Sequence, residues 1–135
     1  MVRLGQADSG GDRWFTLYMP DNRQLEEWAR VAALHGAETR PPLPGEKVGA
    51  ALNVQQGLWP LNGLRHSPAA DTCGWYIWAG EEFSTDDDFF KPAHLEHLRD
   101  WCPSVFPYLG LAPGWRFLIA PGHEDVWFDA SLLGR

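Results

Sequence analysis

The stretch CGWYIWAG, residues 73–80, is the strongest predictor of secondary structure in the chain. It is rich in aromatic side chains and an aliphatic β-branched one, residue types that favour strands. Because successive side chains of a strand point to opposite faces, we expect Trp75 and Ile77 on one face and Tyr76 and Trp78 on the other. Both faces are apolar, which predicts a central strand of a sheet.

Upstream of this strand, the sequence predicts a strand and then a helix. Residues 13–20, RWFTLYMP, have strand composition and close with a proline. Asp21 or Asn22 is suited to cap a helix that runs to about His35, where Gly36 ends it. The apolar side chains that we expect on the buried face of that helix are Leu25, Trp28, Ala29 and Ala32.

The segment between this helix and the central strand is punctuated by glycine and proline. Residues 48–54, VGAALNV, predict a strand of small side chains. Residues 55–72 show no periodicity and predict a loop, which is long for a compact domain. Loops of that length are often functional.

Downstream of the central strand, we expect a helix that begins at Pro92 and a second short helix over residues 103–110. Residues 115–120 and 125–129 predict a closing hairpin with a four-residue loop. The whole pattern predicts an α+β fold with a mainly antiparallel sheet of about five strands, covered by two main helices. We expect residues 1–12 to be a flexible N-terminus and residues 13–135 to form a single domain.

Charge and composition exclude several classes of partner. The formal net charge of −7 argues against binding to nucleic acid or to an anionic membrane surface. Residues 1–11 carry no apolar segment typical of an export signal, so we expect a cytoplasmic protein. Cys73 and Cys102 have no zinc-binding spacing and are expected to be reduced thiols, and no nucleotide or cofactor motif is found. We therefore expect no cofactor.

An acidic and aromatic run directly follows the central strand. Its side chains would form a partner-binding surface, which we predict to consist of Glu81, Glu82, Phe83, Asp86, Asp87 and Asp88. Aromatic residues among charges of one sign provide contact area and attract a basic partner. The alternative is a solvated loop with its phenylalanines turned inward. A second candidate for the partner surface is the loop around Trp59, Arg65 and His66.

Two catalytic alternatives use the same part of the chain. His94 and His97 stand three positions apart, a spacing at which a helix can present two metal ligands, with a third ligand from Asp86–Asp88 or His123–Asp125. The structural alternative places Trp101 against these histidines. Glu81 and Glu82 are candidates for acid–base chemistry, with the alternative of a solvated strand end. Neither pattern is specific, and we expect neither a catalytic residue nor a metal site.

Several segments together resemble a known family. They are GWYIWAGEEFS at 74–84, DDDFFKPAHLEHL at 86–98, WCPSVFPYLGLAPGWRFL at 101–118 and HEDVWFD at 123–129. This series of aromatic, glycine and proline positions, over roughly residues 58–133, is similar to a bacterial immunity-protein family of polymorphic-toxin systems. The resemblance implies a non-enzymatic cytoplasmic protein that binds and neutralises a cognate toxin with a basic surface. It transfers no binding residue.

Three other interpretations stay open at this level. One is a small metal-dependent hydrolase that uses His94, His97 and an acidic residue, and another is a non-catalytic adaptor domain. The third concerns assembly: eight tryptophans can cover a self-interface as well as a core, and a closing hairpin can leave an edge strand for pairing. A homodimer is therefore among the partners that the sequence allows.

Overall fold

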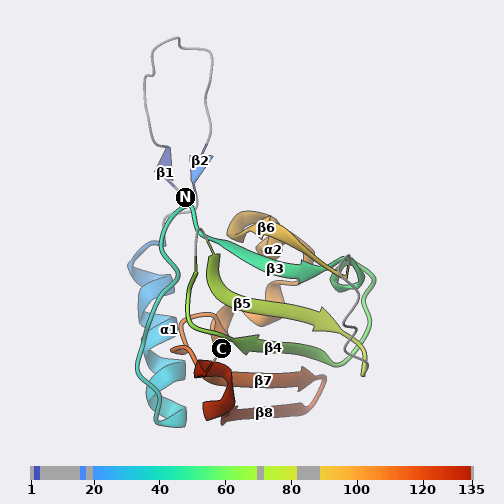
Figure 1. The fold of residues 1–135 in the computed structure, drawn as a ribbon. Helices are drawn as coiled ribbons and strands as arrows, with labels where there is room; N and C mark the ends of the chain where they lie inside the picture. Colours follow the sequence, from blue (N-terminus) through green and yellow to red (C-terminus); the bar gives the residue numbers. More distant parts are fainter. Residues whose placement is uncertain (1, 4–15, 18–19, 70–71, 82–88, 135) are drawn as a thin grey trace.

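The computed structural model of the chain describes residues 2–3, 16–17, 20–69, 72–81 and 89–134 (Figure 1). These residues form two α-helices, α1 (Asn22–His35) and α2 (Leu95–Trp101), and three 3-10 helices, η1 (Leu52–Gln55), η2 (Pro103–Tyr108) and η3 (Ala130–Leu133). The strands are β1 (Val2–Arg3), β2 (Thr16–Leu17), β3 (Lys47–Ala51), β4 (Leu61–Arg65), β5 (Thr72–Ala79), β6 (Phe90–His94), β7 (Trp115–Ala120) and β8 (His123–Phe128). The α+β class is confirmed.

The main sheet has six strands in the order β6-β3-β5-β4-β7-β8 (Figure 1). The pair β3/β5 is parallel, and the other neighbouring pairs are antiparallel. The expected sheet of about five mainly antiparallel strands is thus corrected to a mixed sheet of six. Strands β1 and β2 pair with each other in a separate two-stranded sheet. Most of the expected strand at 13–20 and of the expected flexible N-terminus lies outside the described residues.

Strand β4 corrects the prediction of a loop over residues 55–72. Its five residues are all buried, and it pairs with β5 on one side and β7 on the other. Sequence periodicity missed it because a strand that is buried on both faces has no alternation of polar and apolar residues. Gly63 lies here because the Phe117 ring fills the space of a side chain: a Cβ atom would come within 2.3 Å of that ring.

Two further boundaries differ from the expectation. Pro92 lies inside β6 and not at the start of a helix, and α2 begins at Leu95. A proline is tolerated in β6 because β6 lies at the edge of the six-stranded sheet, the position to which prolines in sheets are largely confined. The closing hairpin is confirmed, but only residues 121–122 connect β7 to β8, because His123 and Glu124 already belong to β8.

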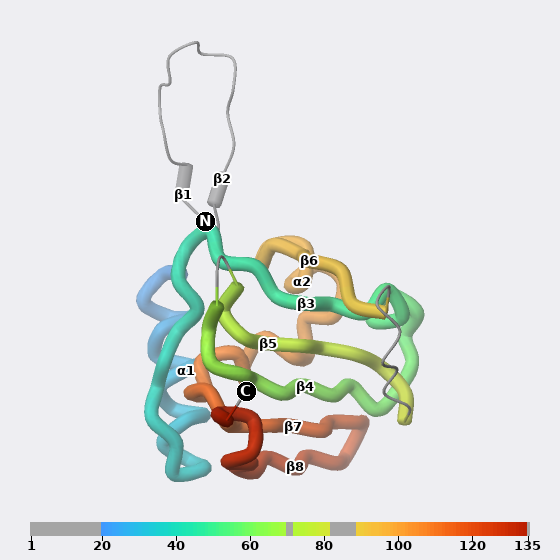
Figure 2. Tube along the Cα trace, in the orientation of Figure 1, coloured from blue at the N-terminus to red at the C-terminus, as the bar shows by residue number. Residues whose placement is uncertain are grey.

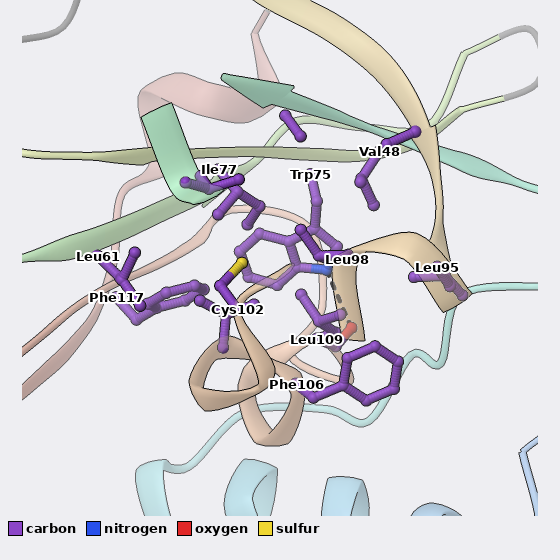
Figure 3. Packing of buried hydrophobic residues seen from close by; sticks show 14 of the residues in the cluster. Val48, Leu61, Trp75, Ile77, Leu95, Leu98, Cys102, Phe106, Leu109 and Phe117 are labelled. Atoms are coloured by element: carbon purple, nitrogen blue, oxygen red, sulfur yellow. Dashed lines mark hydrogen bonds between the residues drawn. The ribbon is translucent and has the colours of Figure 1, made fainter. Parts of the chain in front are cut away.

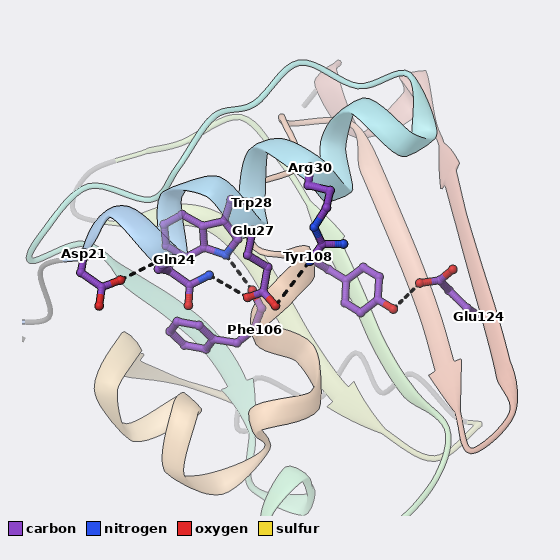
Figure 4. A network of polar contacts seen from close by, with 8 residues as sticks. All are labelled: Asp21, Gln24, Glu27, Trp28, Arg30, Phe106, Tyr108 and Glu124. Atoms are coloured by element: carbon purple, nitrogen blue, oxygen red, sulfur yellow. Dashed lines mark hydrogen bonds and ion pairs between the residues drawn. The ribbon is translucent and has the colours of Figure 1, made fainter.

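Helix α1 begins and ends as predicted. The Asp21 side chain caps it by accepting from the Gln24 backbone N–H at 2.9 Å, and Gly36 adopts the left-handed conformation after its last turn. Figure 4 shows this cap and the indole of Trp28, which donates to the Phe106 carbonyl at 2.7 Å. The buried face differs from the expectation: it consists of Trp28, Val31 and Ala32, whereas Leu25 and Ala29 are exposed.

The main core lies between the sheet and the layer formed by α1, α2 and η2. Trp75 is its centre, and its indole N–H donates to the Leu109 carbonyl at 2.9 Å (Figure 3). Ile77 and Phe117 are buried in the same cluster, and the Trp75 and Phe117 rings are 5.5 Å apart. A buried indole is stable here because its only polar hydrogen is bonded.

The opposite face of the sheet carries a second, smaller cluster. Trp78 and Leu64 pack there with Leu132 of η3, and Tyr76 joins them. Figure 2 shows the C-terminal η3 segment in front of the sheet, on the side away from α2. The predicted alternation along β5 is therefore confirmed: Trp75 and Ile77 face the main core, whereas Tyr76 and Trp78 face the second cluster.

Candidate partner-binding surface

One residue from each candidate surface predicted from the sequence, Glu81 and Trp59, lies at the same end of the sheet. The Gly80 backbone N–H at the end of β5 donates to the Pro60 carbonyl at 2.8 Å. The Asn53 side chain in η1 also holds β5, because it donates to the Ala79 carbonyl at 2.8 Å and accepts from the Ala79 N–H at 3.0 Å. These bonds fix Glu81, the first residue of the acidic run, beside the segment that contains Trp59.

Large apolar side chains are exposed at this end. The exposed fractions are 56% for Leu52, 45% for Leu58 and 46% for Trp59. Glu81 is exposed beside them. We call these four residues the β5-end surface. Exposed apolar side chains that gather beside charge are typical of protein-binding sites, because burying them against a partner is favourable.

The structure places only part of the predicted acidic surface. Glu82, Phe83, Asp86, Asp87 and Asp88 lie outside the described residues. Phe89 and Phe90, which end the run, are half-buried in the second cluster. The Phe90 ring is 5.2 Å from the Tyr76 ring, so these two phenylalanines are turned inward. Leu52 and Leu58 were not among the predicted site residues: Leu52 fell in the strand predicted at 48–54, and Leu58 in the segment predicted to be a loop.

Arg65 and His66 do not belong to an exposed surface. Arg65 is 1% exposed and donates to three backbone carbonyls, those of Cys73 at 2.9 Å, Arg40 at 2.7 Å and Leu111 at 2.7 Å. Burial lowers the pKa of Arg65 to about 10, which leaves it charged at neutral pH. His66 is half-buried, with Nδ1 3.1 Å from the Leu132 carbonyl oxygen. Of this second candidate, only Trp59 is exposed.

The two histidines of the metal hypothesis lie near each other, and the candidate third ligands at 86–88 lie outside the described residues. His94 precedes α2 and His97 lies in its first turn, with ring centroids 5.8 Å apart. Trp101 stacks on His97 at 5.7 Å, as the structural alternative predicted. His123–Asp125 lies on β8, at the opposite edge of the sheet from β6. Within the described ranges, no group of three His, Cys, Asp or Glu side chains is placed to hold a metal ion.

Both cysteines are buried free thiols. Burial raises the pKa of the Cys102 thiol to about 12 and also raises that of Cys73. A thiol with a raised pKa is a poor nucleophile at neutral pH, so the cysteines serve packing.

In its fold, the chain is a small α+β domain with a mixed six-stranded sheet and an exposed apolar surface at one end. The Imm33-like domain family matches residues 27–129, and the chain belongs to this family of immunity proteins. The matched region covers most of α1 and every strand of the main sheet, so it begins earlier than the resemblance over residues 58–133. The comparisons with curated proteins and with solved structures found no match. In the described part of the chain, no helix is both long and apolar enough to cross a membrane.

Proposed function

We propose that this protein neutralises a cognate protein toxin by binding it through the β5-end surface, without catalysis. The observation that supports the proposal is that three large apolar side chains, Leu52, Leu58 and Trp59, are exposed at the same end of the sheet as Glu81, the first residue of the acidic run. Membership of an immunity-protein family implies a toxin as the partner. Aromatic and aliphatic anchors of this kind supply most of the affinity in protein interfaces.

The acidic run predicts that the surface of the proposed partner is basic. Glu81, Glu82 and Asp86–Asp88 place five carboxylates within eight residues of sequence, in a chain whose formal net charge is −7. A toxin with a basic surface would be attracted over a distance of about 10 Å at moderate salt. Such attraction raises the association rate more than it lowers the dissociation rate. We therefore propose that the apolar side chains of the β5-end surface supply the affinity and that the acidic run supplies the long-range attraction.

The first experiment identifies the toxin and tests neutralisation. Tagged protein captures its partner in the source bacterium, and mass spectrometry identifies what co-elutes. The partner is then expressed in a laboratory strain with and without this chain, and growth is measured. Toxicity that disappears when the chain is co-expressed, together with a stoichiometric complex of the purified proteins, supports the proposed function. A partner that is not toxic, or growth that is not restored, contradicts it.

The second experiment tests the surface. Leu58→Ser in the β5-end surface is compared with Leu34→Ser on α1, where Leu34 is also exposed. Because the two variants make the same chemical change at exposed leucines, only their position differs. We expect Leu58→Ser to weaken toxin binding at least about ten-fold and Leu34→Ser to leave it unchanged. If Leu34→Ser has the larger effect, the interface lies on α1.

The third experiment tests the role of charge. Glu82→Lys combined with Asp87→Lys should slow association with the toxin, and the effect should shrink as salt is added. The matched control reverses the charge of Glu26 and Asp100, which are exposed on α1 and α2. An unchanged association rate in the first double variant would remove the acidic run from the interface.

A further inference from the structure

Strand β8 forms an edge of the main sheet and carries exposed aromatic side chains. In Figure 1 it is the lowest strand of the sheet, and among the described residues it pairs only with β7. Trp127 is 39% exposed and Phe128 is 49% exposed. An edge strand of this composition is a template for pairing with another strand.

The register of β7 and β8 shows which backbone groups of β8 are free to pair. The Asp129 N–H donates to the Gly114 carbonyl at 2.7 Å, directly after the pair Trp115–Phe128. In an antiparallel ladder, the pairs alternate between hydrogen-bonded and non-hydrogen-bonded. The N–H and C=O groups of Glu124, Val126 and Phe128 therefore point away from β7.

The carboxylates along this edge are already hydrogen-bonded within the chain. Glu124 accepts from the Tyr108 hydroxyl (Figure 4), and Asp125 lies 2.9 Å from the His123 ring nitrogen. Asp129 accepts from the Arg116 guanidinium at 3.1 Å. A basic partner would have to compete with these internal donors. The edge therefore favours a partner strand whose charged side chains are also paired internally. Strand β8 of a second copy of this chain is such a strand.

If two β8 strands pair symmetrically, one register is more favourable than the two registers next to it. An axis at Asp125 places Asp125 opposite Asp125, and an axis at Trp127 places Asp125 opposite Asp129. Like charges in directly opposed positions are destabilising. An axis at Val126 avoids both contacts.

The Val126 register also brings complementary groups together. It places Glu124 opposite Phe128, Asp125 opposite Trp127 and His123 opposite Asp129. The Arg116 guanidinium lies 5.3 Å from the centre of the Trp127 ring, so Asp125 of one copy approaches the ring over which the other copy's guanidinium lies. In this register the outward-pointing backbone N–H and C=O groups of one copy face those of the other, so they can form the hydrogen bonds of an antiparallel ladder.

We propose that β8 pairs with β8 of a second copy, antiparallel about Val126, and joins two six-stranded sheets into one continuous sheet. This inference does not depend on the toxin, because it concerns residues that are not part of the β5-end surface. The interface is isologous, so each contact occurs twice. It is also narrow, and we expect a dimer that dissociates on dilution.

A disulfide tests the register directly. In the proposed dimer, Val126→Cys places the two new thiols in a hydrogen-bonded pair with Cα atoms about 5.5 Å apart, a separation that a disulfide can bridge. The native cysteines are buried and do not compete. Mild oxidation should therefore yield a covalent dimer. Glu124→Cys is the control, because its two copies are separated by four residues along the strands. Failure of Val126→Cys to cross-link, or equal cross-linking of Glu124→Cys, overturns the proposal.

Opposite charges at Phe128 provide a second test that does not rely on cross-linking. Both Phe128→Glu and Phe128→Lys lose the packing of the ring on Trp115, but only Phe128→Glu places a carboxylate opposite Glu124 of the second copy. Sedimentation at low salt should show dimerisation at least about ten-fold weaker for Phe128→Glu than for Phe128→Lys. Equal dimerisation of the two variants, or a wild-type protein that stays monomeric at all concentrations, contradicts the pairing.

Discussion

The two ends of strand β4 have opposite surroundings. At its last residue, Arg65 is buried and its guanidinium is bonded to three backbone carbonyls from separate segments. Just before its first residue, Leu58 and Trp59 are exposed although they are apolar. The Arg65 end buries a charge that donates to three backbone carbonyls, whereas the Trp59 end leaves apolar side chains exposed.

This difference separates the end that serves stability from the end that we propose as the binding surface. A buried guanidinium is tolerated only when its donors are bonded, so the Arg65 end is committed to the fold. Apolar side chains that stay exposed gain nothing in the isolated chain, but they gain free energy when a partner covers them. We therefore expect substitutions at the Arg65 end to lower the free energy of unfolding much more than substitutions at the Trp59 end.

The largest effect is expected at the Arg65 end. Arg65→Met fills a similar volume but leaves the carbonyls of Cys73, Arg40 and Leu111 without their donor. We expect the free energy of unfolding to fall by about 3–5 kcal/mol, since each buried group without a partner costs about 1–3 kcal/mol. Urea denaturation of the wild type and the variant measures this. A loss below about 1 kcal/mol would show that water replaces the guanidinium and would remove the contrast between the two ends.

A smaller effect is expected where η1 holds β5. Asn53→Ala removes both side-chain bonds to the Ala79 backbone, and we expect a loss of about 1–2 kcal/mol. Gln55→Ala on the same 3-10 helix is the control, because Gln55 is exposed. If both variants unfold at the same urea concentration, Asn53 does not fix the β5-end surface. A loss of toxin binding with Asn53→Ala but not with Gln55→Ala would support the proposal that Asn53 holds the β5-end surface in the conformation that binds.

Little effect on stability is expected from the exposed leucines. Leu52→Ser should change the free energy of unfolding by only about 0.5 kcal/mol, because Leu52 is already 56% exposed. Leu98→Ser is the contrasting variant, since Leu98 is fully buried in the main core and its loss should be severe. Thermal unfolding compares the two. A large destabilisation by Leu52→Ser would mean that Leu52 serves the fold.

The smallest effect concerns pH and lies near the Arg65 end. Hydrogen bonds from Ser131 and then from Arg116 hold the pKa of Asp129 below its ordinary value of 3.8. Because the folded state favours the carboxylate, its contribution to stability is present above the ordinary pKa and is lost as pH falls through the lower folded pKa. Asp129→Asn should therefore flatten the pH dependence of unfolding below about pH 4. An identical pH profile in the variant would show that these bonds do not favour the ionised form.

Residue patterns predicted the elements that have a local signal. The aromatic alternation of β5 and the caps of α1 depend on neighbouring residues, and the structure confirms both. Strand β4 has no such signal, because it is buried on both faces and contains Gly63 and Arg65. Arg65 was placed on a candidate surface because residues 55–72 were interpreted as a long loop, and only its bonds to three distant carbonyls reveal why it is buried.

The candidate surface was partly visible in the sequence for the same reason. The acidic run and the segment around Trp59 were each recognised from composition, but more than twenty residues separate Trp59 from Glu81. Their proximity follows from the pairing of Leu61 with Ala79, which no local pattern encodes. Sequence therefore indicated the residue types of the site, and the topology of the sheet determined which of them lie together.

The position of β4 between β5 and β7 has a consequence for synthesis of the chain. Leu61 pairs with Ile119, so one side of β4 has no strand to bond until β7 has left the ribosome. Contacts between residues so far apart in sequence form late and slow folding. The nascent chain thus exposes a buried strand during most of its translation. A chain with this topology completes its sheet only after nearly all of it has been made, so the supply of folded protein is set by completed chains and not by initiated ones.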